Sequence, residues 1–135
     1  MATAVQVEDF PKQVSPARVA AIEAGLPVKM LRVLMRDYGF TIGELAQAIG
    51  PRRTLERRLE ANERLNVEES QRLARLMRML DLSMEIFKDP ARVRRWLSKE
   101  KRTLGKRVAL DLMRTEDGGR LLEEKLLQLK WGFFA

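Results

Sequence analysis

Apolar residues recur along this chain every three or four positions, the spacing of one face of an α-helix. The pattern is clearest over residues 67–87, where Leu73, Leu76, Met77 and Leu80 share a face. No stretch shows the sustained apolar–polar alternation of a β-strand. The pattern therefore predicts an all-α fold of seven or so short helices. The segments that carry it are 16–25, 27–39, 41–50, 51–65, 67–87, 90–100, 107–115 and 116–130.

Capping residues mark several of these helix boundaries. Ser15 followed by Pro16 is a typical start, because a hydroxyl accepts a bond from a free backbone N–H and proline suits the first helical position. Thr41, with Glu44 three residues later, predicts a capping box. Thr115 is expected to cap the last helix, and glycines at positions 25, 39 and 50 to end earlier ones.

The chain is expected to have three parts. Residues 1–15 mix polar residues and proline without a period, which predicts a flexible N-terminal arm. Lys88, Asp89 and Pro90 interrupt the longest periodic run, which indicates a boundary near residues 81–90. We therefore expect one helical domain over residues 16–82 and a second over residues 83–135.

Composition excludes several classes of function. The chain has 135 residues, of which 45% are hydrophobic, so it can bury a core, but it has no cysteine and no histidine. The usual zinc ligands and the usual general base are therefore missing, and we expect no enzyme activity, no metal and no cofactor. No apolar run approaches the roughly 20 residues that span a bilayer, and no signal peptide is recognisable. The expected location is the cytoplasm.

The net charge of +7 favours a polyanionic partner, but it is unevenly distributed. Residues 1–90 carry 14 basic and 13 acidic side chains, and residues 108–135 carry 4 and 5. Residues 91–107 carry 8 basic side chains and one acidic side chain. This segment could contact DNA, or it could complement an acidic protein surface and speed association.

Residues 41–64 have the layout of a helix-turn-helix motif: a capped helix, a tight Gly50-Pro51 connection and a second helix. Recognition helices meet DNA through their N-terminal residues. The predicted DNA-binding residues are Arg52, Arg53, Thr54, Arg57 and Arg58. The alternative is a solvated helix face, partly neutralised by nearby glutamates.

The C-terminal half carries a series of motifs in a characteristic order. They are Trp96-Leu97, Leu104-Gly105, Leu110-Asp111-Leu112, Thr115-Glu116 with Gly118, and Gly132. This half resembles the toxin-binding domain of Xre/MbcA/ParS-type antitoxins. The upstream segments RTLERR and ESQRL are similar to the Xre-like half of the same proteins, so the resemblance spans roughly residues 27–135.

The resemblance implies an antitoxin without catalysis of its own. Members similar to this sequence pair with RES-domain toxins, which consume or transfer ADP-ribose from NAD. The implied function is to bind and neutralise such a toxin and to repress its own operon by binding operator DNA as a homodimer. A runner-up is a stand-alone helix-turn-helix regulator whose C-terminal domain serves dimerisation only, and a third reading is an interaction module that binds no DNA.

Candidate toxin-binding residues lie in the basic segment and at the chain end. They are Arg94, Arg95, Lys101, Lys130, Trp131, Gly132, Phe133, Phe134 and Ala135. Clustered aromatic residues at a chain end either mark an interface or fold back onto the core, and we favour the interface. Trp96 is expected in the core, and Leu121, Leu122, Leu126 and Leu129 are expected to pack the last helix onto residues 108–113.

Overall fold

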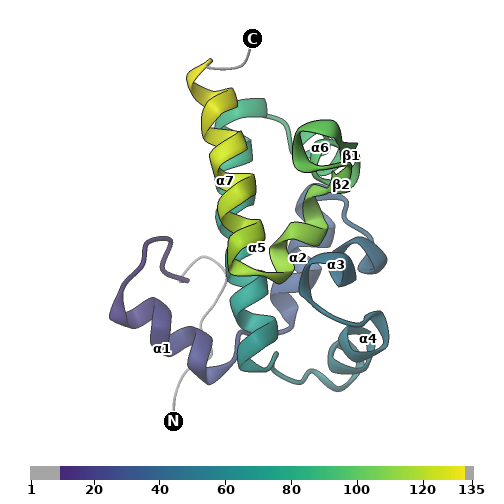
Figure 1. Ribbon diagram of the computed structural model, residues 1–135. Coiled ribbons are helices and arrows are strands. Elements are labelled where there is room, and N and C mark those ends of the chain that lie inside the picture. Colours follow the sequence, from purple (N-terminus) through teal and green to yellow (C-terminus); the bar gives the residue numbers. More distant parts are fainter. Residues whose placement is uncertain (1–9, 133–135) are drawn as a thin grey trace.

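The computed structural model describes residues 10–132 and consists mostly of helices (Figure 1). The seven α-helices are α1 (Pro16–Ala24), α2 (Lys29–Tyr38), α3 (Ile42–Ile49), α4 (Arg52–Ala61), α5 (Val67–Phe87), α6 (Pro90–Ser98) and α7 (Glu116–Trp131) in the described part. Between α6 and α7 lie strands β1 (Glu100–Lys101) and β2 (Arg107–Val108) and the 3-10 helices η2 (Arg102–Leu104) and η3 (Ala109–Arg114). The all-α fold class is confirmed.

The helix ends follow local chemistry. Ser15 and Thr115 cap α1 and α7 by accepting backbone N–H bonds, and the predicted capping box at the start of α3 is present. Helix α4 is shorter than the predicted 51–65. It ends at Ala61 because Asn62 adopts a left-handed conformation with φ of 53°, which asparagine tolerates better than most residues.

Helix α5 is the central helix of the fold and packs against α1, α3, α6, α7 and η3. In Figure 1, α7 runs beside α5 toward the same end, while α1 lies on one side of this pair and α2, α3, α4 and α6 lie on the other. The boundary expected between residues 82 and 83 falls inside α5, which continues to Phe87. Helix α5 therefore packs against elements from both parts of the chain.

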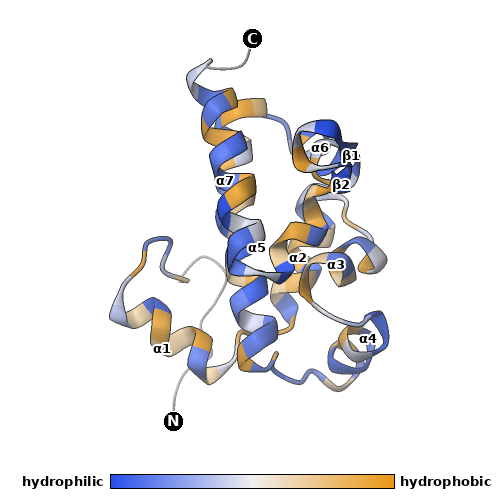
Figure 2. Cartoon of the chain, in the orientation of Figure 1, coloured by the Kyte–Doolittle hydropathy of each residue, from blue (hydrophilic) through white to orange (hydrophobic). Residues whose placement is uncertain are grey.

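The core forms where the apolar faces of these elements meet, as the orange residues of η3, α5 and α7 show in Figure 2. Leu122 and Leu126 are completely buried, and Leu129 packs partly buried against the core, as predicted. The prediction was wrong for Leu121, which is 36% exposed. It lies about 100° around the helix from Leu122, so it turns away when its neighbour faces inward.

Two glycines at the start of α7 allow close packing. A Cβ atom added to Gly119 would lie 2.5 Å from Cδ of Arg75 on α5, and one added to Gly118 would collide with the carbonyl oxygen of Leu112. The absence of side chains here lets the first turn of α7 approach both α5 and η3.

The segment between α6 and α7 differs from expectation. Strands β1 and β2 pair in an antiparallel manner, Glu100 with Val108 and Lys101 with Arg107. Gly105 and Lys106 both take positive φ angles, and residues 102–106 reverse the chain between the two strands. In place of the predicted helix over residues 107–115, the chain forms strand β2 and then η3. The helix does not start at residue 107 because strand pairing holds Val108 in an extended conformation.

The described part of the N-terminal arm packs against α1 and α5. The Arg18 guanidinium lies 4.6 Å from the ring centre of Phe10, which is only 5% exposed. Arg18 also donates hydrogen bonds to the carbonyl oxygens of Pro11 (2.6 Å) and Ala74 (3.1 Å). These contacts satisfy a buried guanidinium that would otherwise be costly to desolvate.

Candidate functional site

Helices α3 and α4 form the predicted helix-turn-helix pair. Leu45, Ala48 and Ile49 of α3 and Leu55 of α4 are completely buried, and the two helices are separated only by residues 50 and 51. Because α4 contributes few buried residues, most of its surface faces outward (Figure 1). The N-terminal turns of α4 are therefore accessible at the surface.

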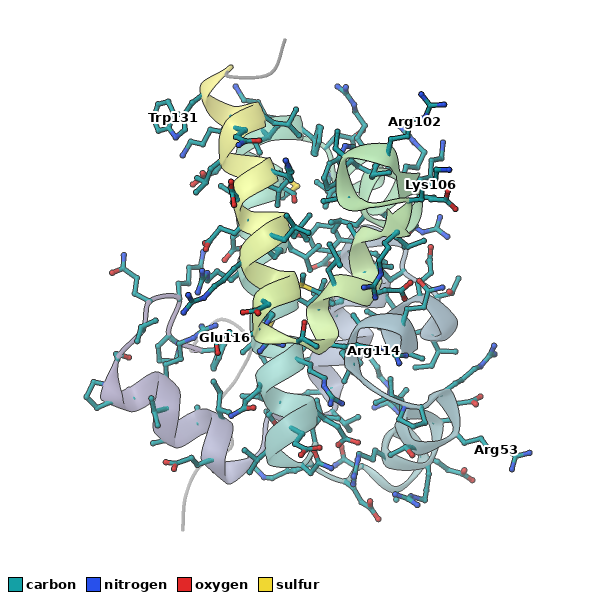
Figure 3. All side chains as sticks on the ribbon, viewed as in Figure 1. Arg53, Arg102, Lys106, Arg114, Glu116 and Trp131 are labelled. Atoms are coloured by element: carbon teal, nitrogen blue, oxygen red, sulfur yellow. The ribbon has the colours of Figure 1, made fainter. Side chains whose placement is uncertain are left out.

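The predicted DNA-binding residues separate into two groups. Arg52, Arg53 and Arg57 are exposed, and Arg53 extends away from the molecule in Figure 3. Arg52 lies 3.5 Å from Glu56 in a surface ion pair. No ion pair joins Arg53 or Arg57 to a residue within the described range 10–132. These two arginines lie one helical turn apart and therefore share one face of α4.

Arg58 belongs to the protein interior rather than to this outer surface. Its side chain is 14% exposed, and its Nε lies 2.8 Å from Glu69, a residue of α5. Its Nη1 donates to Glu63 at 3.2 Å. Arg58 therefore holds α4 against α5. Thr54, the remaining predicted contact, is half-buried.

Helix α6 joins the helix-turn-helix pair through Glu44. The Glu44 carboxylate accepts hydrogen bonds from Thr41 N–H (2.9 Å), Arg94 Nε (3.0 Å) and Ser98 Oγ (2.7 Å). Burial would raise the pKa of Glu44, but these three hydrogen bonds and the Arg94 charge together lower it. Arg94, predicted to bind toxin, is thus already paired within the chain.

Arg114 makes a second link to the same helix, α3. Its Nε donates to the carbonyl oxygen of Gln47 at 2.7 Å, and its Nη2 to that of Ala46 at 3.4 Å. Cationic side chains stabilise the C-terminal end of a helix, where carbonyl groups lack partners. The C-terminal half therefore holds both ends of α3. Sequence reasoning missed these contacts because the partners are far apart in the chain.

The other basic residues of segment 91–107 lie on different surfaces. Arg95 and Lys101 face the end of α5, where Lys101 Nζ lies 4.9 Å from the ring centre of Trp96. Trp96 was expected in the core and is half-buried, with its ring centre 5.7 Å from that of Phe87. The fold thus divides this segment between an internal contact and an exposed basic surface.

The end of α7 presents an exposed aromatic residue. Trp131 is 63% exposed, and Lys130 Nζ lies 5.2 Å from its ring centre and 2.9 Å from Glu85 Oε2 of α5. Gly132 ends the helix in a left-handed conformation. The other three predicted tail contacts, Phe133, Phe134 and Ala135, lie outside the described residues.

Comparison with known families assigns both parts of this fold. The antitoxin Xre-like helix-turn-helix domain matches residues 17–78, which run from α1 into α5. The antitoxin Xre/MbcA/ParS C-terminal toxin-binding domain matches residues 83–132, from late α5 to the end of α7. The chain belongs to the Xre-type antitoxins. The two family domains share α5, which explains why the halves pack as one body.

Three bacterial relatives, each described as antitoxin Xre, support this membership. The Pseudomonas putida protein is 34% identical over 83 residues, which cover 62% of this chain and 52% of the relative. The Photorhabdus laumondii protein is 28% identical over 111 residues, covering 81% and 75% of the two chains. The Yersinia enterocolitica protein is 29% identical over 119 residues, covering 87% and 80%. The match to the first relative spans about half of that protein's length.

The described residues contain neither a membrane-spanning helix nor a cluster of metal ligands. No helix within residues 10–132 combines the length and hydropathy needed to cross a membrane. Over the same range, no group of three or more acidic, histidine or cysteine side chains is placed to hold a metal ion.

Proposed function

We propose that this Xre-type antitoxin neutralises a toxin through its C-terminal half and binds operator DNA through α4. The observation that carries the proposal is the pair of family domains on one fold, joined where Arg94 and Ser98 contact Glu44 of the helix-turn-helix. A DNA-binding element and a toxin-binding element in one chain allow the antitoxin to repress its own operon, and we include autorepression in the proposal.

The proposed DNA contacts are the exposed residues of α4. Arg53 and Arg57 are the main candidates because they are exposed and lack ion pairs with described residues. Arg52 and Thr54 lie at the N-terminal end of α4, where the helix dipole also favours phosphate. We leave Arg58 out, since it pairs with Glu69. A homodimer would place two such helices on the two halves of a palindromic operator.

The proposed toxin contacts lie at the end of the molecule where α5 and α7 finish. The exposed Trp131 and the residues after it are proposed to enter the substrate cleft of the toxin. Aromatic side chains bury 150–250 Å² each, so a short tail supplies a large contact area. The partner we propose is a RES-domain toxin that acts on NAD, as the sequence resemblance implies, and Lys130 and Gly132 set where the tail leaves α7.

The DNA part of the proposal is tested by mobility shift with the segment upstream of the gene. Arg53→Ala combined with Arg57→Ala should weaken retention and reduce the slope of log affinity against log salt by about 4, since the dimer loses two phosphate contacts per subunit and each contributes about 0.9. The matched control is Arg36→Ala with Arg120→Ala, which removes the same charge from two exposed arginines on α2 and α7. Equal binding by the two double variants would show that α4 does not contact DNA.

The toxin part is tested by co-expression with a RES-domain toxin, the partner class proposed above. The full chain should restore growth and the cellular NAD level, and a chain that ends at Lys130 should restore neither while keeping its helix content and DNA binding. Rescue by the shortened chain would place toxin binding elsewhere than the tail. Failure of the full chain to rescue growth would contradict the choice of toxin.

A further inference from the structure

A small surface cavity of about 200 Å³ lies where the end of α5 meets α6 and β1. Its walls are Phe87, Arg92, Arg95, Trp96, Lys99 and Lys101. We call this the cationic pocket. Two of the six side chains are aromatic, four are cationic, and none is a carboxylate.

Phe87 and Trp96 supply the apolar part of the lining of the cationic pocket. The Phe87 and Trp96 rings are tilted by 38° with centres 5.7 Å apart, so they present one continuous apolar surface. Lys101 lies over the Trp96 ring, with Nζ 4.9 Å from its centre. An ammonium in this position is held by the electron-rich ring face. The pocket therefore combines apolar contact area with positive charge.

The four cations of the cationic pocket lack acidic partners among the described residues. Elsewhere on the surface, cations pair with carboxylates, as Arg94 does with Glu44 and Lys130 with Glu85. Burial, and then the nearby charge of Lys99, lower the pKa of Lys101. Like charges placed together without counter-charges destabilise one another, and binding an anionic group would relieve this repulsion.

The cationic pocket lies at the toxin-binding end of the molecule. The ion pair between Lys130 and Glu85 holds the end of α7 beside the end of α5, two residues from Phe87. Helix α4 lies toward the other end of the molecule in Figure 1. Arg94 and Ser98 occupy the flank of α6 that faces α3, whereas Arg92 and Trp96 occupy the flank that faces the pocket.

We infer that the cationic pocket binds an acidic segment of the toxin, one that inserts an apolar side chain flanked by carboxylates. A volume of about 200 Å³ fits a single large side chain. The two aromatic rings can contact that side chain, and the four cations can pair with carboxylates on either side of it. The inference rests on the proposed function in assuming that the partner at this end is a protein rather than DNA.

The first test needs no toxin. In the Trp131→Phe variant, Trp96 is the only tryptophan, so its fluorescence reports occupancy of the cationic pocket. The probe is a synthetic peptide with one phenylalanine between pairs of glutamates, and its control has glutamines in their place. The glutamate peptide should change Trp96 emission saturably, and the glutamine peptide should bind about tenfold or more weakly.

Two triple variants with the same change in net charge locate the contact. Arg92→Ala, Arg95→Ala and Lys99→Ala together should weaken binding of the glutamate peptide about tenfold. Arg102→Ala, Lys106→Ala and Arg107→Ala together should change it less than twofold, since these hairpin residues do not line the pocket. The comparison is repeated at about 0.5 M salt, where screening leaves mainly close contacts.

The outcomes separate the inference from the proposed function. Equal weakening by both triple variants, or tighter binding of a short DNA duplex than of the glutamate peptide at Trp96, would overturn the inference. If the peptide binds the pocket but the pocket variants hold the purified toxin as tightly as the parent chain does, the pocket does not serve the toxin interface. If no toxin is neutralised at all, the proposed function fails while the peptide result still stands.

Discussion

Replacing Glu44 by alanine should destabilise the whole molecule, because this carboxylate joins the helix-turn-helix to the C-terminal half. The side chain is 17% exposed. It accepts the Thr41 N–H at 2.9 Å, the Ser98 hydroxyl at 2.7 Å and Arg94 Nε at 3.0 Å. The variant removes the shared acceptor of all three donors.

The size of the effect follows from these contacts. The capping-box bond contributes about 1 kcal/mol, and the Ser98 bond to a charged acceptor contributes at least about 1 kcal/mol. The ion pair with Arg94, which is 37% exposed, contributes at most about 1 kcal/mol. We therefore expect a loss of about 3 kcal/mol in the free energy of unfolding, and a fall in Tm of roughly 10 °C.

Urea unfolding followed by circular dichroism measures this loss. The matched control is Glu56→Ala, because Glu56 is 51% exposed and lies 3.5 Å from Arg52, which is 62% exposed. We expect the control to cost about 0.5 kcal/mol or less. The parent chain should unfold in one transition, since α3 is held from both ends by the C-terminal half. Equal costs for Glu44→Ala and Glu56→Ala, or two separate transitions, would refute the reasoning.

Three further results are expected. The folded-state pKa of Glu44 is lowered, so the stabilising effect of its charge is present above the ordinary glutamate pKa and is lost as the pH falls through the folded-state pKa. The difference in the free energy of unfolding between the parent and Glu44→Gln should therefore narrow as the pH falls below the ordinary value of about 4.3. Gly118→Ala should cost about 2 kcal/mol or more in thermal unfolding, because the new methyl group would collide with the Leu112 carbonyl oxygen, and a neutral effect would show that η3 can shift. Ser83→Ala should be neutral or stabilising by up to about 1 kcal/mol, since the buried Ser83 hydroxyl has no hydrogen-bond partner among residues 10–132. Ser70→Ala should destabilise, because the Ser70 hydroxyl accepts a buried backbone N–H, and the reverse order would contradict this.

Helix positions were predictable from the sequence because their signals are local. Caps such as Ser15, Thr41 and Thr115 act within three residues of themselves, and the apolar periodicity of residues 67–87 reports directly on the buried face of α5. The same local information placed the turn at Gly50-Pro51 between α3 and α4.

Features that depend on distant contacts were not predictable. The hairpin of β1 and β2 has two residues in each strand, too few to show an alternating pattern. Arg58 looked like its neighbours on α4, but Glu69 on α5 pairs with it. Likewise, nothing local marks Arg94 as the partner of a carboxylate 50 residues earlier.

The candidate site was predictable in part. The sequence indicated a basic helix α4 and an aromatic chain end, and it indicated that segment 91–107 is strongly basic. It could not show how the fold distributes that charge, with Arg94 turned toward α3 and Arg95 toward Trp96. A helix presents different residues on each flank, and only its neighbours decide which flank is covered.

Titration of a purified toxin tests whether this chain is an antitoxin that acts through its C-terminal half. The rate of NAD consumption by the RES-domain toxin proposed as the partner is measured against increasing amounts of the full chain. The rate should fall to background at a fixed molar ratio, and a chain ending at Lys130 should require a large excess. An unchanged rate in the presence of excess folded full chain would show that the chain does not neutralise this toxin.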